Sequence, residues 1–438
     1  MGSKAIEEGF FRFTSRLTRW FPRTGARILD GVFYPILSNG LLLRYFRNKN
    51  LKTLQGIRSF RRMLVIADIH IGDAILAETA VSALKDFFPE AQVDFAVKKS
   101  LEKLIEGHPD ISQVWPVFTG GQFPNKSDIQ GIQELSAEYD AVFNLCPFLE
   151  KKHFPKDGNV FHVTTHAPVF ARNERRPGPP NHIAYQVHRF VYDILSLRFP
   201  IRRARPFESP RVFLSPAAIR EAQQFVKALS LRGGEPVVFL NPDTASPFTR
   251  IPFHFQAELL KGLADMPCRI LVGEGHTEKG IGERLLWQLP LLKRNRVKLV
   301  PAGFSLEAYT ALIDHCDVFL SGDTGPLHLA AARKFDRNGR KPLGNRTAVF
   351  SVFGATPPRF SGYDSGPGFL ESGQDAPARS YPSVSSCRNV TCVHKMAKVC
   401  DAKGCFESLD TGKILADIQS RLSELPAFKP AGVPAWNF

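Results

Sequence analysis

The stretch Asp317-Val-Phe-Leu-Ser-Gly-Asp-Thr-Gly-Pro-Leu-His-Leu-Ala-Ala-Ala332 decides how the second half of this chain folds. Its first residues form the apolar run of a buried strand, which ends at a turn from Gly322 to Pro326. Pro326 at a first-turn position and the alanines after it predict a helix. Free N–H groups and the dipole at such a helix start favour a diphosphate, so the turn is a candidate phosphate site.

Individual residues of this turn support that interpretation. Gly322 and Gly325 let the backbone approach a ligand closely, and Thr324 and His328 can donate hydrogen bonds from the first turn. A simpler alternative is that Asp323 only caps the helix and His328 is a packed polar residue.

The same alternation of strand and helix extends through most of the chain. It predicts an α/β protein with two doubly wound Rossmann-like domains that face each other across a ligand-binding cleft. We expect an N-terminal extension (residues 1–60), a first domain (61–215) and a second domain (216–438). Residues 147–215 look irregular, with insertions around the mouth of the cleft. Neither domain carries a full G-x-G-x-x-G, which argues against a dehydrogenase-type dinucleotide site. The predicted strands are 63–66, 93–97, 114–117, 141–145, 237–240, 269–272, 297–300, 318–320 and 348–353.

Two further polar segments follow predicted strands and therefore face the same cleft. In the loop 241–253, Arg250 can pair with phosphate, and Ser246 or Thr249 can donate hydrogen bonds, although one solvated arginine in a proline-bounded loop is the plainer interpretation. In the segment 69–74, the carboxylate of Asp73 can act as general base on an acceptor hydroxyl, or simply cap a helix.

The positive charge of the chain is concentrated at its N-terminus. Of a net charge of +15, about +10 lies in residues 1–62. Residues 10–23 place bulky apolar side chains on one arc of a helix and arginines on the other, which suits the headgroup region of an anionic membrane. A helix docked on the protein's own surface is the alternative. A nucleic-acid enzyme would more often spread its basic residues along a groove, so no nucleic-acid partner is expected.

No secretory signal and no apolar run long enough to cross a bilayer are recognisable. We therefore expect a cytoplasmic protein, peripheral on the inner membrane.

The cysteines fall into two groups. A cluster near the C-terminus is a candidate structural zinc or iron site, with free thiols as the alternative; its members are Cys387, Cys392, Cys400 and Cys405. Cys146, Cys268 and Cys316 lie in or beside apolar runs and are expected in the core.

Taken in order, the motifs resemble the heptosyltransferase family of lipopolysaccharide synthesis, glycosyltransferase family nine. The resemblance covers about residues 61 to 425 and is carried by Met63-Leu-Val-Ile-Ala-Asp-Ile-His-Ile-Gly-Asp-Ala74, Asn241-Pro-Asp-Thr-Ala-Ser-Pro-Phe-Thr-Arg250 and Gly322-Asp-Thr-Gly-Pro-Leu-His-Leu-Ala-Ala-Ala332. It implies the metal-independent, inverting arrangement called GT-B. His70 departs from the family, in which Ser or a similar small residue is usual.

Carried over position by position, the resemblance makes Asp73 the catalytic base and Arg250 the residue that faces the donor phosphates. Ser246, Thr324 and Gly325 match further phosphate contacts. Phe304 matches the residue that packs against adenine, and Glu278 is a candidate for the ribose. The expected donor site as a whole is Ser246, Arg250, Glu278, Phe304, Asp323, Thr324, Gly325 and His328.

The expected activity is transfer of heptose or a related sugar from a nucleotide-diphosphate donor, ADP-heptose being the first candidate, to a lipopolysaccharide-core or other lipid-linked acceptor. No cofactor is expected for catalysis. A non-catalytic nucleotide-sugar-binding or scaffold protein with the same fold is the alternative.

Overall fold

The computed structural model of the 438-residue chain describes residues 40–121, 123–163, 182–203, 207, 209–229, 235–245, 249–275, 277–333, 347–354, 358–363, 378–382, 405–406 and 408–425. The predicted amphipathic segment 10–23 lies outside these residues.

The first half of the described chain forms a five-stranded parallel sheet with the order β3-β2-β1-β4-β5. Counted along the chain this is 3-2-1-4-5, the start of the strand order of dinucleotide-binding folds. Most strand residues are apolar because both faces of such a sheet are covered. The strands are β1 (Arg62–Ile66), β2 (Gln92–Lys98), β3 (Gln113–Phe118), β4 (Ala141–Asn144) and β5 (Val160–His162).

The second half repeats the arrangement in a six-stranded parallel sheet with the order β11-β10-β9-β6-β7-β8. Numbered along the chain and read from β8 to β11, this is 3-2-1-4-5-6, so the predicted pair of doubly wound sheets is confirmed. The strands are β6 (Val237–Asn241), β7 (Arg269–Gly273), β8 (Val297–Val300), β9 (Val318–Gly322), β10 (Ala348–Phe353) and β11 (Ala378–Pro382).

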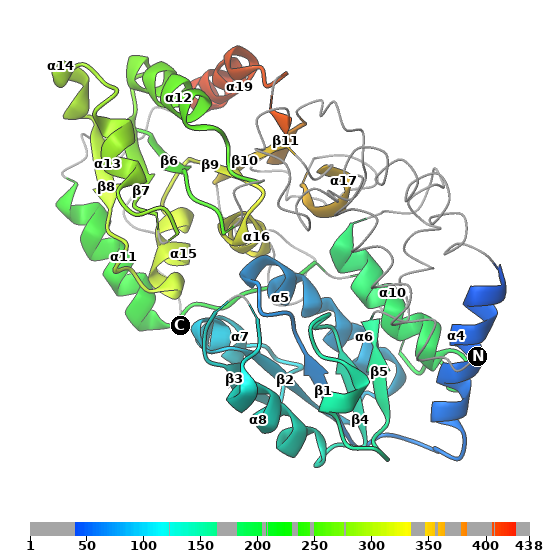
Figure 1. Cartoon of the computed structure of the whole chain (residues 1–438). Coiled ribbons are helices and arrows are strands. Elements are labelled where there is room, and N and C mark those ends of the chain that lie inside the picture. Colours follow the sequence, from blue (N-terminus) through cyan, green and yellow to red (C-terminus); the bar gives the residue numbers. More distant parts are fainter. Residues whose placement is uncertain are drawn as a thin grey trace.

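Helices cover the sheets, as Figure 1 shows. Those of the first half are α4 (Gly40–Leu54), α5 (Ile71–Ala77), α6 (Thr79–Phe87), η2 (Lys99–Leu101), α7 (Glu102–Glu106), α8 (Lys126–Ser136), η3 (Lys151–His153) and α10 (Ile183–Leu195). Those of the second half are α11 (Pro216–Ala228), α12 (Phe253–Asp265), α13 (Ile281–Leu286), α14 (Leu291–Arg294), α15 (Leu306–Asp314), α16 (Gly325–Ala332), α17 (Pro358–Ser361) and α19 (Thr411–Glu424). None of the described helices is long and apolar enough to cross a bilayer.

The segment 147–215, expected to be irregular, contains a buried helix. In α10, apolar residues recur at helical spacing, and Phe190, Val191 and Ile194 are almost completely buried against α5 and α6. His182 begins the helix by accepting a hydrogen bond from the N–H of Ala184 through Nδ1.

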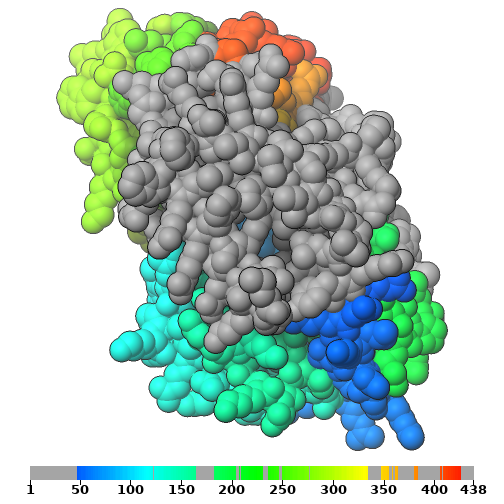
Figure 2. Space-filling view, turned by 45° about the vertical axis from the view of Figure 1, so that its right-hand side comes forward, coloured from blue at the N-terminus to red at the C-terminus, as the bar shows by residue number. Residues whose placement is uncertain are grey.

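Part of the predicted N-terminal extension also belongs to the first core. Leu54 and Phe60 are buried there, and the ring of Phe60 contacts those of Phe88 and Phe199. Helix α4 therefore lies against the first unit, at the opposite end of the molecule from α19 (Figures 1 and 2).

The two halves meet where α5 lies against α16 (Figure 1). Leu76 of α5 is buried among apolar residues of the second unit, and Leu329 of α16 is buried in the core of the first. This mutual insertion fixes the starts of the two helices beside each other.

Candidate active site

The candidate site lies at the points where the strand order reverses in both sheets. Helix α5 follows β1, which lies between β2 and β4, and α16 follows β9, which lies between β10 and β6. Ligands of open parallel sheets bind outside the carboxyl ends of the strands at such points. Asp73 is exposed in the first turn of α5, and Gly325 begins α16.

The first turns of α5 and α16 touch through glycine. A Cβ built on Gly72 would lie 2.4 Å from Cδ2 of His328, and one built on Gly325 would lie 2.8 Å from Cβ of Ile71. Neither position has room for a side chain without displacement of its neighbour. The two glycines therefore allow Asp73 and the predicted phosphate turn to approach each other across the domain boundary.

The imidazole of His328 is buried at this boundary, and its Nδ1 lies 2.9 Å from the hydroxyl of Tyr363. Burial lowers the pKa of His328 to about 4, so the ring is neutral at physiological pH. Burial also raises the pKa of Tyr363, which keeps the phenol protonated. Tyr363, absent from the predicted site, thus holds His328 in place.

The residue that caps α16 is not the one named in the simpler alternative. Thr324, not Asp323, is the N-cap residue, and its side chain makes no capping hydrogen bond. Asp323 instead accepts a hydrogen bond of 3.2 Å from Oγ of Ser361. Of the simpler alternative, the part in which Asp323 caps the helix is therefore wrong, whereas His328 is the packed polar residue that its other part expected.

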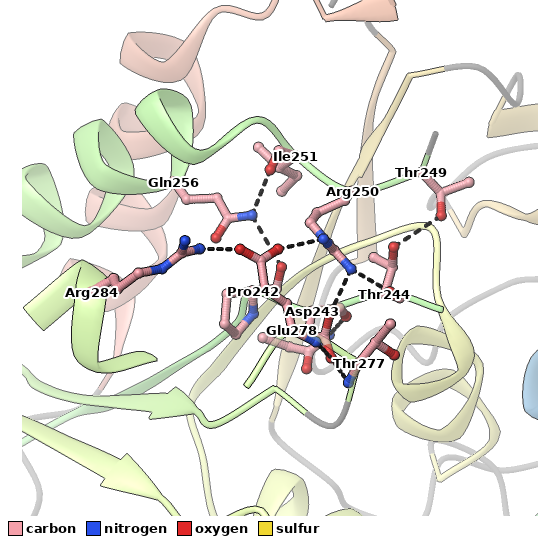
Figure 3. A network of polar contacts seen from close by, with 11 residues as sticks. Pro242, Asp243, Thr244, Thr249, Arg250, Ile251, Gln256, Thr277, Glu278 and Arg284 are labelled. Atoms are coloured by element: carbon pink, nitrogen blue, oxygen red, sulfur yellow. Dashed lines mark hydrogen bonds and ion pairs between the residues drawn. The ribbon is translucent and has the colours of Figure 1, made fainter. Parts of the chain in front are cut away.

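Arg250 lies in a polar network at the carboxyl end of β6 (Figure 3). Its Nη2 donates to Asp243 at 3.1 Å and to the carbonyl of Thr244 at 3.0 Å, and its Nη1 donates to Glu278. Nε of Arg250 is buried, with no hydrogen-bond partner in the described part of the chain. The guanidinium is thus anchored by two carboxylates.

Asp243 organises this network, a role that no motif in the sequence predicted. Its carboxylate also accepts hydrogen bonds from the backbone N–H groups of Thr277, at 2.6 Å, and Glu278, at 3.3 Å. It therefore ties the loop after β7 to the loop after β6.

The other predicted donor residues are placed as follows. Glu278, expected at the ribose, has its carboxylate paired with Arg250 and Arg284. Phe304 is half-buried, with its ring edge-on to Phe225 at 5.2 Å. Ser246 lies outside the described residues.

Beside Asp73 the structure adds two residues that the prediction did not use. Nδ1 of His70 lies 2.7 Å from Oδ1 of Asp68, and the backbone N–H of His70 donates to the same oxygen at 2.9 Å. A ring nitrogen of His70 and one carboxylate oxygen each of Asp68 and Asp73 lie within 4.8 Å of one another. Because the shortest of these contacts is a hydrogen bond, we interpret the trio as a hydrogen-bonded cluster rather than a metal centre.

The cysteine predictions divide between described and undescribed residues. Cys146, Cys268 and Cys316 are buried as expected, and burial raises the pKa of the first two to about 12. Cys405 is buried as well. Cys387, Cys392 and Cys400 lie outside the described residues, so the metal-site prediction stays a prediction.

Comparison with known proteins agrees with this architecture. Residues 199–362 match the model of glycosyltransferase family 9 (heptosyltransferase). Lipopolysaccharide heptosyltransferase 2 of Salmonella typhimurium is 23% identical over 380 residues, which cover 83% of this chain and 99% of the relative. Lipooligosaccharide heptosyltransferase 2 of Haemophilus influenzae is 21% identical over 310 residues, 68% of this chain and 85% of the relative.

Solved structures show the same fold. The family 9 glycosyltransferase of Veillonella parvula superposes with a TM-score of 0.58 at 15% identity, over 83% of this chain and 98% of that one. ADP-heptose lps heptosyltransferase II of E. coli superposes with a TM-score of 0.54 at 16% identity, over 83% of this chain and 98% of that one. The chain is therefore a glycosyltransferase with the GT-B fold, and its residues 199–362 match glycosyltransferase family 9, the heptosyltransferase family.

Proposed function

We propose that this enzyme transfers heptose or a related sugar, with inversion, from a nucleoside-diphosphate donor to a lipopolysaccharide-core or other lipid-linked acceptor. The observation that carries the proposal is the contact between Gly72 and His328, which brings Asp73 next to the start of α16. ADP-heptose is the first candidate donor, because the E. coli structure of the same fold is named for it.

On the donor side, two sources of positive potential are available to the leaving diphosphate. The start of α16 has a Thr324 cap without a side-chain bond, so the N–H of Gly325 can face an anion, whereas Pro326 has no N–H and that of Leu327 donates to the carbonyl of Thr324. Arg250, held by Asp243, adds a charged donor from the second loop. Positive charge here stabilises the diphosphate as the bond to the anomeric carbon breaks.

On the acceptor side, Asp73 would remove the proton of the attacking hydroxyl. Its carboxylate is exposed in the first turn of α5, beside the donor turn. Attack from the side opposite to the diphosphate inverts the anomeric centre, and the base is needed as the new C–O bond forms.

Metal independence is part of the proposal. The helix start and Arg250 supply the charge that a divalent cation would otherwise bring to a leaving diphosphate. Activity that survives a chelator would support this, and strict dependence on added Mg²⁺ would exclude it.

The lipid-linked acceptor would place the enzyme on the inner membrane. The basic amphipathic segment 10–23 suits binding to an anionic surface. Deletion of residues 1–39 should release the protein from anionic vesicles without loss of donor binding.

A panel of nucleotide sugars tested for thermal stabilisation identifies the donor, and Asp73→Ala then tests the chemistry. We expect one donor to raise Tm in both proteins, with sugar transfer lost in the variant. Stabilisation by no nucleotide sugar would overturn the proposed donor site. Unchanged transfer by Asp73→Ala would exclude this residue as the base, and donor binding by a wild type that transfers no sugar would favour a scaffold role.

A further inference from the structure

Three side chains that can accept a proton lie close together around the start of α5: those of Asp68, His70 and Asp73. His70 is the N-cap residue of α5, and its side chain is 43% exposed, whereas that of Asp68 is 9% exposed. A carboxylate oxygen accepts hydrogen bonds, so Nδ1 of His70 carries the hydrogen in the 2.7 Å contact with Asp68. In the neutral ring the lone pair is then on Nε2, which is the basic nitrogen.

The backbone fixes this arrangement. Oδ1 of Asp68 also accepts the N–H of His70, and the carbonyl of His70 accepts the N–H of Ala74 in the first turn of α5. The imidazole therefore has little freedom to leave the carboxylate. A carboxylate that orients an imidazole through Nδ1–H and stabilises the imidazolium is an established way to make histidine an efficient proton acceptor.

Aromatic rings continue from His70 to the surface. The ring of His70 lies 5.9 Å from that of Phe148, which lies 5.0 Å edge-on from that of Phe123. Phe123 is 63% exposed, although so large an apolar side chain is usually covered. Such a row suits the apolar C–H face of an acceptor sugar.

We propose that Asp68 and His70 form a dyad that receives the proton which Asp73 takes from the acceptor hydroxyl. This inference rests on the proposed function and names the route of the proton. The acceptor oxygen bonds to the anomeric carbon, and the diphosphate leaves with the electron pair of the broken bond. The proton passes from the hydroxyl to Asp73 and then to Nε2 of His70, directly or across one water molecule. The partly exposed imidazolium finally releases it to solvent.

Several titratable groups lie around the dyad in the described part of the chain. Asp68 comes from the end of β1, Asp73 from α5, and His328 from α16, where it packs on Gly72. Cys146, after β4, is close enough to Asp68 that the carboxylate helps burial to raise the thiol's pKa. Two carboxylates beside one imidazole favour the imidazolium, which is the form that the relay produces.

Activity against pH tests the dyad in the full-length enzyme. For the wild type we expect kcat/KM to fall on the acidic side as His70 takes up a proton, at or above the ordinary imidazole range near about pH 6.5 because two carboxylates are close. His70→Gln keeps a polar side chain of similar reach but has no basic nitrogen. It should lower kcat roughly 100-fold and leave donor affinity unchanged. The acidic limb of the pH profile of kcat/KM should move to the pH range in which carboxylates titrate. Asp68→Asn should lower kcat roughly tenfold and shift the limb to lower pH.

Phe123→Leu serves as a matched control, since it alters the aromatic row without touching the dyad. It should change the acceptor KM while the pH profile stays that of the wild type. A His70→Gln enzyme within twofold of wild-type kcat, with the same acidic limb, would overturn the proposal. A chelator that abolishes wild-type activity would also overturn it, because the trio would then act through a metal.

A second readout does not depend on turnover. In ¹⁵N-histidine-labelled protein, the signal that His70→Gln removes should show the neutral tautomer protonated at Nδ1, and Asp68→Asn should change it. The Nε2-protonated tautomer would refute the dyad even if no acceptor were known. Failure of the wild type to bind any nucleotide sugar, with the Nδ1 tautomer present, would instead count against the proposed function.

Discussion

Gly72 and His328 are in contact across the boundary between the two sheets, so closely that a Cβ on Gly72 would lie 2.4 Å from the imidazole. The ring cannot easily yield, because its Nδ1 is hydrogen-bonded to Tyr363 and the side chain is buried. The glycine before the proposed base thus sets how near Asp73 lies to the phosphate turn. The distance between the proposed base and the proposed phosphate site therefore depends on the absence of a side chain at Gly72.

Gly72→Ala should therefore impair catalysis. The added methyl group must displace His328 or separate α5 from α16, at a cost of about 1–3 kcal/mol in stability. We expect kcat/KM to fall at least roughly tenfold, since small misplacements of reacting groups are costly. Steady-state kinetics and thermal unfolding measure both effects.

Gly131→Ala is the matched control. Gly131 is exposed within α8, and a Cβ there would meet nothing within 4 Å. It should stabilise the protein by about 0.5–1 kcal/mol with unchanged activity. Equal behaviour of the two alanine variants would show that the contact has no role in positioning.

Asp243→Ala should weaken donor binding through Arg250. The substitution removes a carboxylate partner of the guanidinium and leaves the N–H groups of Thr277 and Glu278 without their acceptor. We expect affinity for the nucleoside diphosphate to drop at least roughly tenfold, about 1.4 kcal/mol. Calorimetric titration with ADP measures it.

Arg284→Ala provides the comparison, because Arg284 pairs with Glu278 in the same network but its side chain is 55% exposed. Exposed ion pairs contribute about 0–1 kcal/mol, so this variant should bind ADP almost as the wild type does. If both variants lost affinity equally, the anchoring role of Asp243 would be refuted.

The fold was predictable because its strands are parallel and covered on both faces. Such strands are continuous apolar runs, and Val237–Asn241 and Ala348–Phe353 both stand out in this way. Helix α10 was missed although Ala184, Val187 and Val191 recur at helical spacing. The irregular, His- and Pro-rich sequence around it concealed the pattern.

The site was predictable only where its residues are close together in the sequence. The turn at Gly322 and the helix after it are encoded by adjacent residues, as is the position of Asp73 at the start of α5. The partners of Arg250 were not, because Glu278 lies 28 residues away and its contact depends on the pairing of β6 with β7. Neither spacing nor periodicity records such a contact.

Glu78→Ala should strongly destabilise the first unit. Glu78 is buried with His108 and Arg211, whose side chains are 0% and 4% exposed. Nδ1 of His108 accepts the N–H of Asp110, so its Nε2–H donates to Glu78, and the N–H of Arg211 donates to the same carboxylate. Removing the carboxylate takes a counter-charge from a buried guanidinium, at a cost of about 3–5 kcal/mol.

Chemical denaturation measures this loss, with Lys152→Ala as control. Lys152 pairs with Glu150 at 2.9 Å, but both side chains are about two-thirds exposed. Its removal should change the free energy of unfolding by less than about 1 kcal/mol. A Glu78→Ala protein as stable as the Lys152→Ala protein would show that the buried cluster contributes nothing net.

Acidification should destabilise the protein before its carboxylates titrate, because two buried histidines meet at the domain boundary. Burial lowers the pKa of His182 to about 3 and that of His328 to about 4, against about 6.5 in an unfolded chain. Above pH 6.5 both rings are neutral in either state and contribute no pH dependence. Below it the unfolded chain binds protons that the folded protein excludes, so stability falls until the folded pKa is reached.

Between pH 7 and pH 5 each histidine should account for a loss of roughly 2 kcal/mol. His182→Asn isolates one of them, because asparagine can still accept the N–H of Ala184 as an N-cap but does not titrate. The difference in unfolding free energy between pH 7 and pH 5 should shrink by roughly 2 kcal/mol in this variant. The readout is this difference and not the absolute stability, which the smaller side chain also changes. An unchanged pH dependence would mean that His182 is not held neutral, and the boundary would then tolerate a buried charge.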